Sequence, residues 1–201
     1  MKPIKIFGDP ISGNCLKVKW TLDHIGLDYE WVTLGILKGD TRTEEFLKKN
    51  PFGQVPTVVL ENDNVLVQSN AIIVSIAERE GSELLPVEFS QRSQVYQWLF
   101  WEQNSHEPYV AGRRFRKAYL GKQDDEIDQE WLPRGNAALA LMDGVISDQS
   151  FLVGDSLTLA DISLVAYTRL ADEGGFDLSQ FPNVIDWIGR VEDVLNIKAT
   201  G

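Results

Sequence analysis

The sequence predicts an α/β unit over residues 1–80 and an all-helical unit over residues 89–201, joined by a linker at residues 81–88. Two observations lead to this division. Short apolar segments of strand character alternate with helical patterns up to residue 80, whereas only helical patterns follow. The charge is also uneven, because residues 1–81 carry 9 basic and 11 acidic side chains (net −2) and residues 82–201 carry 10 and 19 (net −9).

The first unit has the predicted order β-α-β-α-β-β-α. We expect the first three strands to be parallel because helical segments join them, and the fourth to be antiparallel because a tight turn at residues 61–64 precedes it. The third helix is expected to carry Ser69 and Asn70 at its N-cap. This order is that of the thioredoxin fold. The predicted strands are 4–7, 29–34, 55–60 and 65–67, and the predicted helices are 12–24, 43–49 and 69–76.

The second unit shows helical spacing of its apolar residues throughout. Pro133 lies inside the second predicted helix, where it either kinks the helix or marks a later start. Thr158 and Asp161 have the spacing of a capping box, with aspartate in place of the usual glutamate or glutamine, which indicates a role in folding. The predicted helices of this unit are 89–118, 124–146, 158–171 and 181–195.

Composition argues against several classes of function. Cys15 is the only cysteine, so an internal disulfide is impossible, and with two histidines in the chain no metal site is predicted. The net charge of −11 disfavours nucleic-acid binding because it repels phosphate backbones. The chain has no run of 18 apolar residues, and its first residues lack the apolar segment of a signal peptide. We therefore expect a soluble cytoplasmic protein that does not bind membranes.

The segment SGNC at residues 12–15 lies between the first strand and the first helix, where a thioredoxin-type unit carries its C-x-x-C pair. The first position of the pair is exposed at the positive end of the helix, where anions are stabilised. Ser12 in this position cannot form a disulfide, but its hydroxyl can hydrogen-bond the thiolate of a ligand. Two structural interpretations also stand: Ser12 as the N-cap of the helix, and Cys15 as a buried apolar side chain rather than a reactive thiol.

Two further segments carry groups that can bind an extended peptide, the first its backbone and the second its end. Val55-Pro56 opens a strand, and a cis bond there would turn the amide and carbonyl of Val55 outward to pair with a peptide. Gln68 and Ser69 start a helix whose amides suit a carboxylate, and the Gln68 side chain can both donate and accept. Each pattern alone also fits a structural role, as a proline at a strand start or an N-cap. In order, the three segments match a small thiol peptide, and glutathione fits.

These segments make the chain resemble the cytosolic glutathione S-transferases over essentially its whole length. The resemblance implies a thioredoxin-like N-terminal domain that binds glutathione as co-substrate, a helical C-terminal domain that holds the electrophile, and a homodimer. It also implies a serine-type transferase related to the theta, delta and beta classes, with a role in detoxification. The motifs that carry the resemblance are SGNC at 12–15, KV at 17–18, NPFGQVP at 50–56, QSNAI at 68–72 and LTLAD at 157–161.

The resemblance also assigns candidate site residues by position. Ser12 resembles the catalytic serine of the family. Asn14 and Cys15 are further catalytic candidates, because related bacterial proteins use an asparagine two positions after the serine and beta-class enzymes use a cysteine in this region. Gly53 stands where some classes have a histidine near the glycyl carboxylate, which is a departure from the family pattern. The glutathione-binding candidates are Lys38 and Gln54 for the glycyl end, Val55 and Pro56 for the cysteine backbone, and Gln68 and Ser69 for the γ-glutamyl group.

The implied reaction is attack of the glutathione thiolate on a small, largely apolar electrophile. A free thiol has a pKa near roughly 8.5, so Ser12 and the dipole of the first helix would act by favouring the thiolate. Residues 89–118 offer aromatic and basic side chains, among them Trp98, Trp101 and His106, for the electrophile, although packing explains them as well. Two alternatives stay open: glutathione-dependent disulfide or peroxide reduction, and a non-catalytic binding protein.

Overall fold

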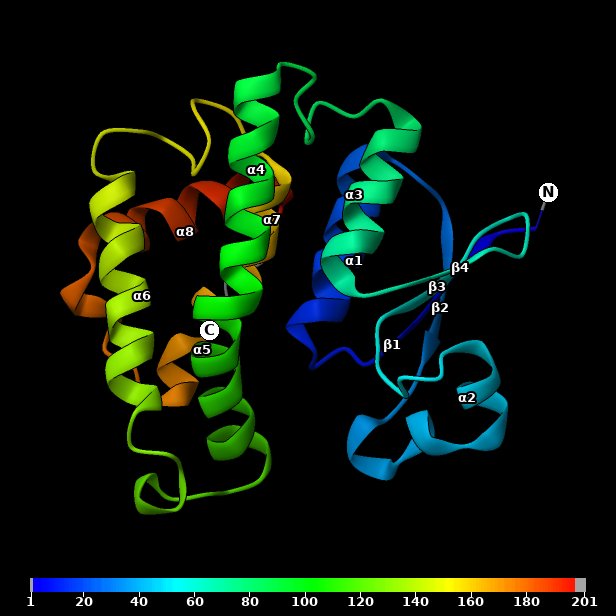
Figure 1. The fold of residues 1–201 in the computed structure, drawn as a ribbon, viewed down its shortest axis with the longest axis horizontal. Helices are drawn as coiled ribbons and strands as arrows, with labels where there is room; N and C mark the ends of the chain where they lie inside the picture. Colours follow the sequence, from blue (N-terminus) through cyan, green and yellow to red (C-terminus); the bar gives the residue numbers. More distant parts are fainter. Residues whose placement is uncertain (1, 198–201) are drawn as a thin grey trace. The chain divides into compact units, whose positions relative to one another are not determined.

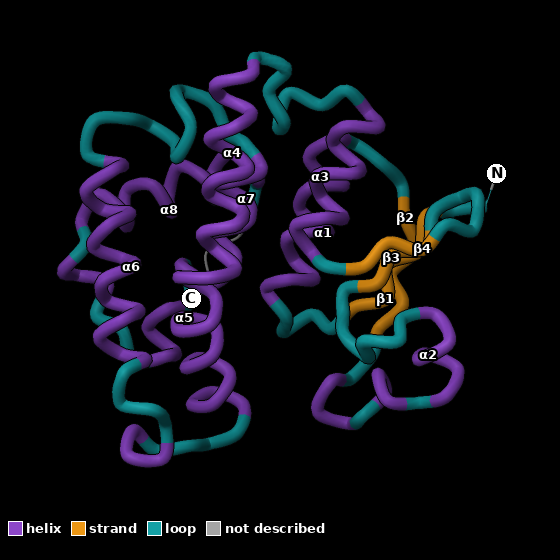
Figure 2. The backbone as a smooth tube through the Cα atoms, in the orientation of Figure 1, coloured by secondary structure: helices purple, strands orange, loops and turns teal. Residues whose placement is uncertain are grey.

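The computed structural model describes residues 2–197 (Figure 1). The chain divides into two compact units, Met1–Leu85 and Pro86–Gly201. The first unit contains a sheet together with three α-helices (Figure 2). In the second unit the part of the chain from residue 86 to residue 197 contains helices and turns and no strand.

The sheet of the first unit has four strands in the order β2-β1-β3-β4. β1 and β2 are parallel, with Ile4 opposite Tyr29 and Gly8 opposite Thr33. β3 is antiparallel to both of its neighbours, β1 and β4. The strands are β1 (Ile4–Gly8), β2 (Tyr29–Thr33), β3 (Thr57–Val59) and β4 (Val65–Val67).

The direction of β3 corrects the prediction that the first three strands are parallel. Thr57, the first residue of β3, pairs with Phe7 near the end of β1, so the chain enters β3 at the end of the sheet where β1 finishes. The connection before it contains only short turns and helix α2 (Glu44–Lys49). The connection, residues 34–56, begins where β2 finishes and ends at the same end of the sheet, so β3 runs back antiparallel to β1.

Helices α1 (Gly13–Ile25) and α3 (Ser69–Glu80) lie side by side on one face of the sheet, and α2 lies on the other (Figure 1). Helix α1 ends one residue after the predicted end at residue 24, because Gly26 adopts a left-handed conformation (φ +80°) that terminates it. The apolar residues of α1 and α3 recur every three or four positions and form the core with the strands. Buried members of this core are Ile4, Ile6, Val18, Leu22, Val58, Ile72, Ile73 and Ile76.

The second unit has five α-helices in its described part, and the predicted single helix over 89–118 is interrupted. Two π-helical turns, at Glu102–His106 and Phe115–Tyr119, divide this stretch. The first π turn is followed closely by Pro108, which has no amide hydrogen to continue the α-helical pattern. Pro133 lies in the first turn of its helix, so the later start is the correct interpretation. The helices are α4 (Phe89–Trp101), α5 (Glu107–Arg114), α6 (Trp131–Ile146), α7 (Leu159–Thr168) and α8 (Pro182–Leu195).

Helix α7 forms the centre of the second unit, since all its residues are buried. The predicted capping box is present: Asp161 accepts from the amide and the hydroxyl of Thr158, each at 2.9 Å. Asp161 also accepts from the amide of Leu152 at 2.8 Å and from the indole of Trp187 at 2.9 Å. This carboxylate therefore joins α7 to the preceding loop and to α8.

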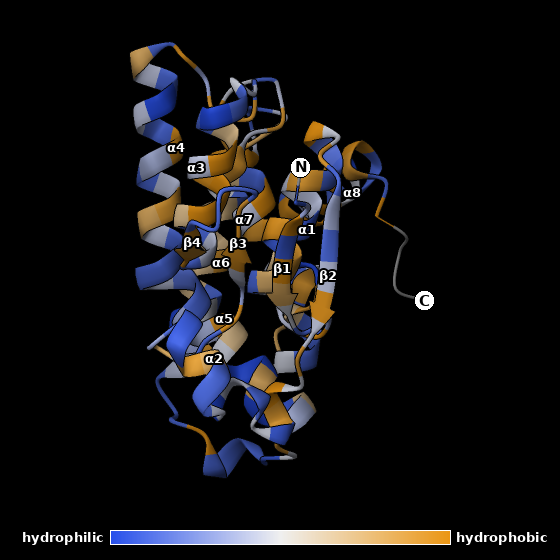
Figure 3. Cartoon of the chain, turned by 90° about the vertical axis from the view of Figure 1, so that its right-hand side faces the viewer, coloured by the Kyte–Doolittle hydropathy of each residue, from blue (hydrophilic) through white to orange (hydrophobic). Residues whose placement is uncertain are grey.

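Helix α4 differs from α7, because hydrophilic and hydrophobic segments alternate along it (Figure 3). Phe89 and Phe100, near its two ends, have 83% and 77% of their surface exposed. In residues 2–197, no helix combines the length and the hydrophobicity that crossing a membrane requires.

Candidate functional site

The register of the sheet brings the three predicted segments of the site to one end of it. Phe7, near the end of β1, pairs with Thr57, which in turn pairs with Val67 at the end of β4. Residues 12–15 follow β1 at this end, residues 53–56 precede β3, and residues 68–69 follow β4. Segments up to 57 positions apart in sequence therefore meet above the same strand ends.

Two hydrogen bonds join these segments. The Ser69 hydroxyl donates to Oδ1 of Asn14 at 2.8 Å, which links the start of α3 to the first turn of α1. The Gln68 side-chain amide donates to Oε1 of Gln54 at 3.2 Å. These two hydrogen bonds place four of the predicted residues in contact, as the pairs Ser69–Asn14 and Gln68–Gln54.

Ser12 occupies the N-cap position of α1, with an extended backbone. Its hydroxyl makes no capping hydrogen bond, so the structure does not support the interpretation of this side chain as a simple cap. Its amide donates to the Asp9 carbonyl at 3.0 Å, which fixes the chain as it enters the helix. The side chain is half-buried, at the positive end of the helix dipole.

Cys15 has the features of a packing residue. Its side chain is 0% exposed, and its sulfur accepts the amide of Asp9 at 3.4 Å. Burial raises the pKa of the thiol to about 11, against the smaller opposing effect of a side-chain hydrogen bond with Ser12. A thiol with that pKa is un-ionised at neutral pH, which does not suit a nucleophile.

Asp9 is a residue of this site that the sequence reasoning did not identify. One carboxylate oxygen accepts the amide of Ile11 at 3.1 Å, and the other accepts the amide of Ile36 at 2.9 Å. The buried carboxylate therefore holds the loop before Ser12 against the loop that follows β2. Its only sequence signal is its place in the Gly8-Asp9-Pro10 run that ends the first strand.

The Val55–Pro56 peptide bond is cis. The backbone amide and carbonyl of Val55 have no hydrogen-bond partner within residues 2–197, while the side chain is half-buried. Asn50 holds this loop, because its side-chain amide donates to the Gln54 carbonyl at 2.8 Å and to the Thr57 hydroxyl at 3.0 Å. The arrangement leaves the backbone of one residue, two positions before β3, available to pair with an extended ligand.

Gln68 immediately precedes α3 with φ of +69° and ψ of 112°, a conformation that residues with side chains rarely adopt. Strained backbone of this kind occurs preferentially at ligand sites. Helix α3 begins at Ser69, so the prediction that Ser69 and Asn70 form the N-cap is wrong by one position. The Ser69 hydroxyl is directed to Asn14 instead, because Gln68 occupies the cap.

Lys38 ends the short 3-10 turn Ile36–Lys38 and is exposed. No described contact joins it to the other predicted residues. Arg42, which the sequence reasoning did not consider, lies beside Gly53: a Cβ on Gly53 would be 2.5 Å from Nη1 of Arg42. Nη1 of Arg42 also donates to the Phe52 carbonyl at 3.5 Å. The structure thus adds a second cation next to Gln54.

The aromatic and basic residues of 89–118 have structural partners. Nε2 of the buried His106 is 3.0 Å from the Thr168 hydroxyl. The Trp98 indole donates to the Leu152 carbonyl at 3.1 Å. Nε of the buried Arg113 donates to the Gly174 carbonyl at 3.0 Å. These contacts agree with packing roles.

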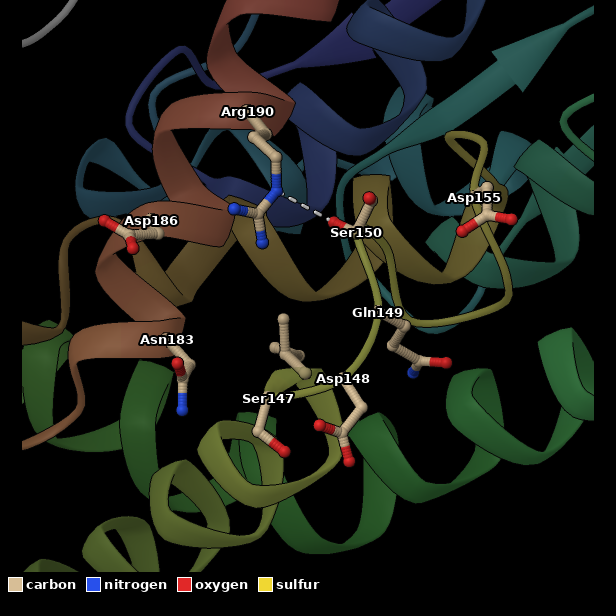
Figure 4. A pocket seen from close by; sticks show the side chains of 9 residues that line it. Ser147, Asp148, Gln149, Ser150, Asp155, Asn183, Asp186 and Arg190 are labelled. Carbon is tan, nitrogen blue, oxygen red and sulfur yellow. Dashed lines mark hydrogen bonds between the residues drawn. The ribbon is translucent and has the colours of Figure 1, made fainter.

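A pocket of about 350 Å³ lies within the second unit, between the end of α6, the loop after it and α8 (Figure 4). Its lining is mainly polar and includes three carboxylates and Arg190, whose Nε donates to the Ser150 carbonyl at 3.0 Å. None of the predicted site residues lines it. Among residues 2–197, no group of three or more His, Cys, Asp or Glu side chains is placed to hold a metal ion.

Comparison with known proteins agrees with this geometry. Residues 2–78 match the family model of the glutathione S-transferase N-terminal domain, and residues 94–193 match that of the C-terminal domain. A crystal structure of a glutathione S-transferase from Pseudomonas fluorescens is similar with a TM-score of 0.90 and 46% identity, covering 95% of each chain. Glutathione S-transferase 3 of Zea mays is 32% identical over 80% of this chain and 75% of its own length.

A third relative also matches nearly the whole chain. Glutathione S-transferase D7 of Drosophila melanogaster is 28% identical over 96% of this chain and 86% of its own length. The two family models together span both units of the structure. The chain therefore belongs to the glutathione S-transferase family.

Proposed function

We propose that this transferase binds glutathione across the three segments at the end of its sheet and activates the glutathione thiol for attack on small, largely apolar electrophiles. The observation that carries the proposal is the backbone of Val55, whose amide and carbonyl have no hydrogen-bond partner within residues 2–197 and which lies at the same end of the sheet as the other two segments. The side chain of the neighbouring Gln54 accepts a hydrogen bond from Gln68, and the Ser69 hydroxyl donates one to Asn14. A peptide of three residues can pair with Val55 while its thiol and its carboxylates reach the two helix N-termini.

Each part of glutathione has a proposed partner. The cysteine backbone pairs with Val55 beside Pro56, and the γ-glutamyl group binds Gln68 and Ser69 at the positive end of α3. The glycyl carboxylate meets Gln54 and a cation. Lys38 is the cation that the family pattern suggests, and Arg42 is a second candidate because it lies against Gly53.

Thiol activation is assigned to Ser12. Its hydroxyl donates to the thiolate sulfur, and the dipole of α1 adds a favourable field. In the reaction the thiol proton passes to solvent, the sulfur forms a bond to an electrophilic carbon, and a leaving group departs with its electron pair. Asn14 is a second candidate for contact with the sulfur, whereas Cys15 is given a packing role because of its burial and raised pKa.

The two alternatives are less well supported. Reduction of disulfides or peroxides by a thiol of the protein needs a reactive cysteine, and the single cysteine is buried. A non-catalytic binding protein has no need of Ser12, Val55 and Ser69 together. The named transferases among the relatives also favour transfer of glutathione.

The second unit would supply the electrophile site, and the protein would act in detoxification in the cytoplasm as a homodimer. The exposed Phe89 and Phe100 of α4 support a partner surface, since large apolar side chains on a surface helix favour association. Sedimentation equilibrium tests this part: twice the mass of the chain is expected, and the mass of one chain at micromolar concentration would refute it.

The experiment that tests the activity combines binding with product analysis. Glutathione and an aryl halide are incubated with the protein, and the thioether is identified by mass spectrometry. A thioether formed faster than without protein is expected. Binding of glutathione without any conjugate across a panel of aryl halides, epoxides and enones would favour the non-catalytic alternative, and reduction of a mixed disulfide would favour the redox alternative.

A further inference from the structure

Asp9 makes hydrogen bonds both to the loop between β1 and α1 and to the loop that follows β2. One carboxylate oxygen accepts the amide of Ile11 at 3.1 Å, and the other accepts the amide of Ile36 at 2.9 Å. Its backbone carbonyl accepts the amide of Ser12 at 3.0 Å. The residue is 6% exposed. The backbone that carries Ser12 is therefore tied through Asp9 to the loop after β2.

The neighbours of Asp9 leave it little freedom to move. Its amide donates to the sulfur of Cys15 at 3.4 Å. The carbonyl of the preceding Gly8 accepts the amide of Leu34 at 2.9 Å, and a Cβ on Gly8 would be 3.3 Å from Cβ of Cys15. The first turn of α1 and the loop after β2 thus both contact the segment formed by Gly8 and Asp9.

The charge of Asp9 does not explain its place beside the proposed thiol site, because a negative charge near a thiolate disfavours that thiolate. The hydrogen bonds do explain it. Two oxygens on one short side chain accept from two backbone segments, whereas asparagine, the neutral side chain of the same length, has one acceptor oxygen. Resting on the proposed function, we propose that Asp9 is a positioning residue that holds the Ser12 segment where the hydroxyl meets the glutathione sulfur.

Position and charge predict opposite signs for the loss of the Asp9 carboxylate. In Asp9→Asn one of the two amides, of Ile11 or Ile36, loses its acceptor, and the Ser12 segment is held less firmly. Loss of position raises the pKa of the bound glutathione thiol, by about 0.5–1 unit, which is a threefold to tenfold smaller thiolate fraction at a given pH. Loss of charge alone would lower that pKa.

A double-mutant cycle shows whether Asp9 acts through Ser12. The ultraviolet thiolate band is measured against pH at saturating glutathione in the wild type, Asp9→Asn, Ser12→Ala and the double variant. Asp9→Asn should raise the midpoint in the wild-type background. In the Ser12→Ala background no hydroxyl is left to position, so Asp9→Asn should leave the midpoint unchanged or lower it. The other titratable and charged groups on these segments stay in place in every variant: Cys15, Lys38, Asp40 and Arg42.

Ile36→Pro removes one of the two hydrogen bonds while the Asp9 charge stays. Ile36 is the first residue of the 3-10 turn Ile36–Lys38, a position that tolerates proline. The preceding Gly35 has φ of −88° and ψ of 104°, an extended conformation that suits a residue before proline. Ile36→Pro should shift the thiolate midpoint upward as Asp9→Asn does, and it is the second variant if Asp9→Asn does not fold.

Asp143→Asn is the matched control for a loss of stability alone. The Asp143 carboxylate accepts the backbone amide of Val184 at 3.1 Å and the side-chain amide of Asn183 at 3.2 Å, both within the second unit. Asp143→Asn should lower the urea midpoint of unfolding, as Asp9→Asn does, and leave the thiolate midpoint of bound glutathione at the wild-type value.

Two results would overturn the inference. One is a thiolate midpoint in Asp9→Asn equal to or below that of the wild type, and the other is an upward shift of the same size in the Ser12→Ala background. Failure of the proposed function has a separate signature, because the wild type with glutathione would then show no thiolate band at neutral pH, and the inference would fall with it.

Discussion

The side-chain amide of Asn50 donates to the hydroxyl of Thr57 at 3.0 Å and so ties the start of the loop before β3 to the first residue of the strand. The same amide donates to the Gln54 carbonyl at 2.8 Å, and Oδ1 of Asn50 accepts the Phe52 amide at 3.0 Å. Asn50 is 1% exposed. One side chain thus holds the loop that presents the Val55 backbone.

Replacement of Asn50 by alanine is expected to weaken both stability and glutathione binding. The change leaves the Gln54 carbonyl and the Phe52 amide without this partner, which costs about 1–3 kcal/mol of unfolding free energy. The KM for glutathione should rise severalfold with a smaller change in kcat, because the loop positions ligand and not the reacting atoms. Urea unfolding and steady-state kinetics check this. An Asn50→Ala protein with wild-type KM would show that the loop holds its shape without this side chain.

The Asp161 carboxylate organises the second unit, so Asp161→Asn should be strongly destabilising. The amide group that replaces the carboxylate has one acceptor oxygen in place of two, so some of the donors from Leu152, Thr158 and Trp187 lose their partner. The expected loss is about 2–4 kcal/mol, measured by denaturant unfolding. Asp155→Asn, an exposed change in the same region, is the control and should lie within about 0.5 kcal/mol of wild type. Equal stability of the two variants would contradict the assigned role.

We expect ionisation of the Cys15 thiol to lower the free energy of unfolding at alkaline pH. Its pKa rises from an ordinary value of 9.0 to about 11 on folding, because burial disfavours the thiolate. The folded state therefore holds the proton that the unfolded state loses above pH 9, and this contribution to stability is complete below pH 9 and lost as pH rises toward 11. The decline approaches about 1.4 kcal/mol per pH unit.

Cys15→Ala isolates this effect from the titration of lysines and tyrosines. The unfolding free energy of wild type minus that of the variant, measured at several pH values from 7 to 10.5, should be constant to about pH 9 and then decrease. A difference that stays constant over the whole range would show that the thiol ionises equally in both states.

A shortened substrate, γ-glutamylcysteine, shows whether Arg42 or Lys38 binds the glycyl carboxylate of glutathione. If Arg42 binds the glycyl carboxylate, Arg42→Ala raises the KM for glutathione about tenfold, the loss of one charge-assisted hydrogen bond of about 1.4 kcal/mol. The same variant leaves the KM for γ-glutamylcysteine, which lacks glycine, nearly unchanged. Lys38→Ala is the matched variant. If instead Lys38→Ala raises the KM for glutathione and leaves the KM for γ-glutamylcysteine unchanged, Lys38 is the residue that binds the glycyl carboxylate.

The sequence was sufficient to predict local features of the fold to within one or two residues. The first helix (predicted 12–24, observed 13–25), β3 (predicted 55–60, observed 57–59) and the capping box of Thr158 and Asp161 depend on residues a few positions apart. The direction of β3 was not accessible in this way. An apolar strand has the same pattern whether it runs parallel or antiparallel, and the connection at residues 34–56 is long enough for either direction.

Contacts between distant residues explain the rest of what the sequence did not predict. The hydrogen bond from Ser69 to Asn14 and the place of Arg42 beside Gly53 depend on how the loops meet at one end of the sheet. The role of Asp9 likewise depends on the amide of Ile36, 27 positions away. No periodicity or short motif records such pairs.

The central claim is that Ser12 activates the thiol of bound glutathione, and the ultraviolet difference spectrum of the complex against pH tests it most directly. We expect a thiolate band at neutral pH, and in Ser12→Ala a midpoint shifted upward by about 1–2 pH units, as loss of a hydrogen bond to a charged group of about 1.5–3 kcal/mol requires. Ser75→Ala, an exposed serine of α3, should match the wild type. A band of wild-type midpoint in Ser12→Ala would contradict the claim.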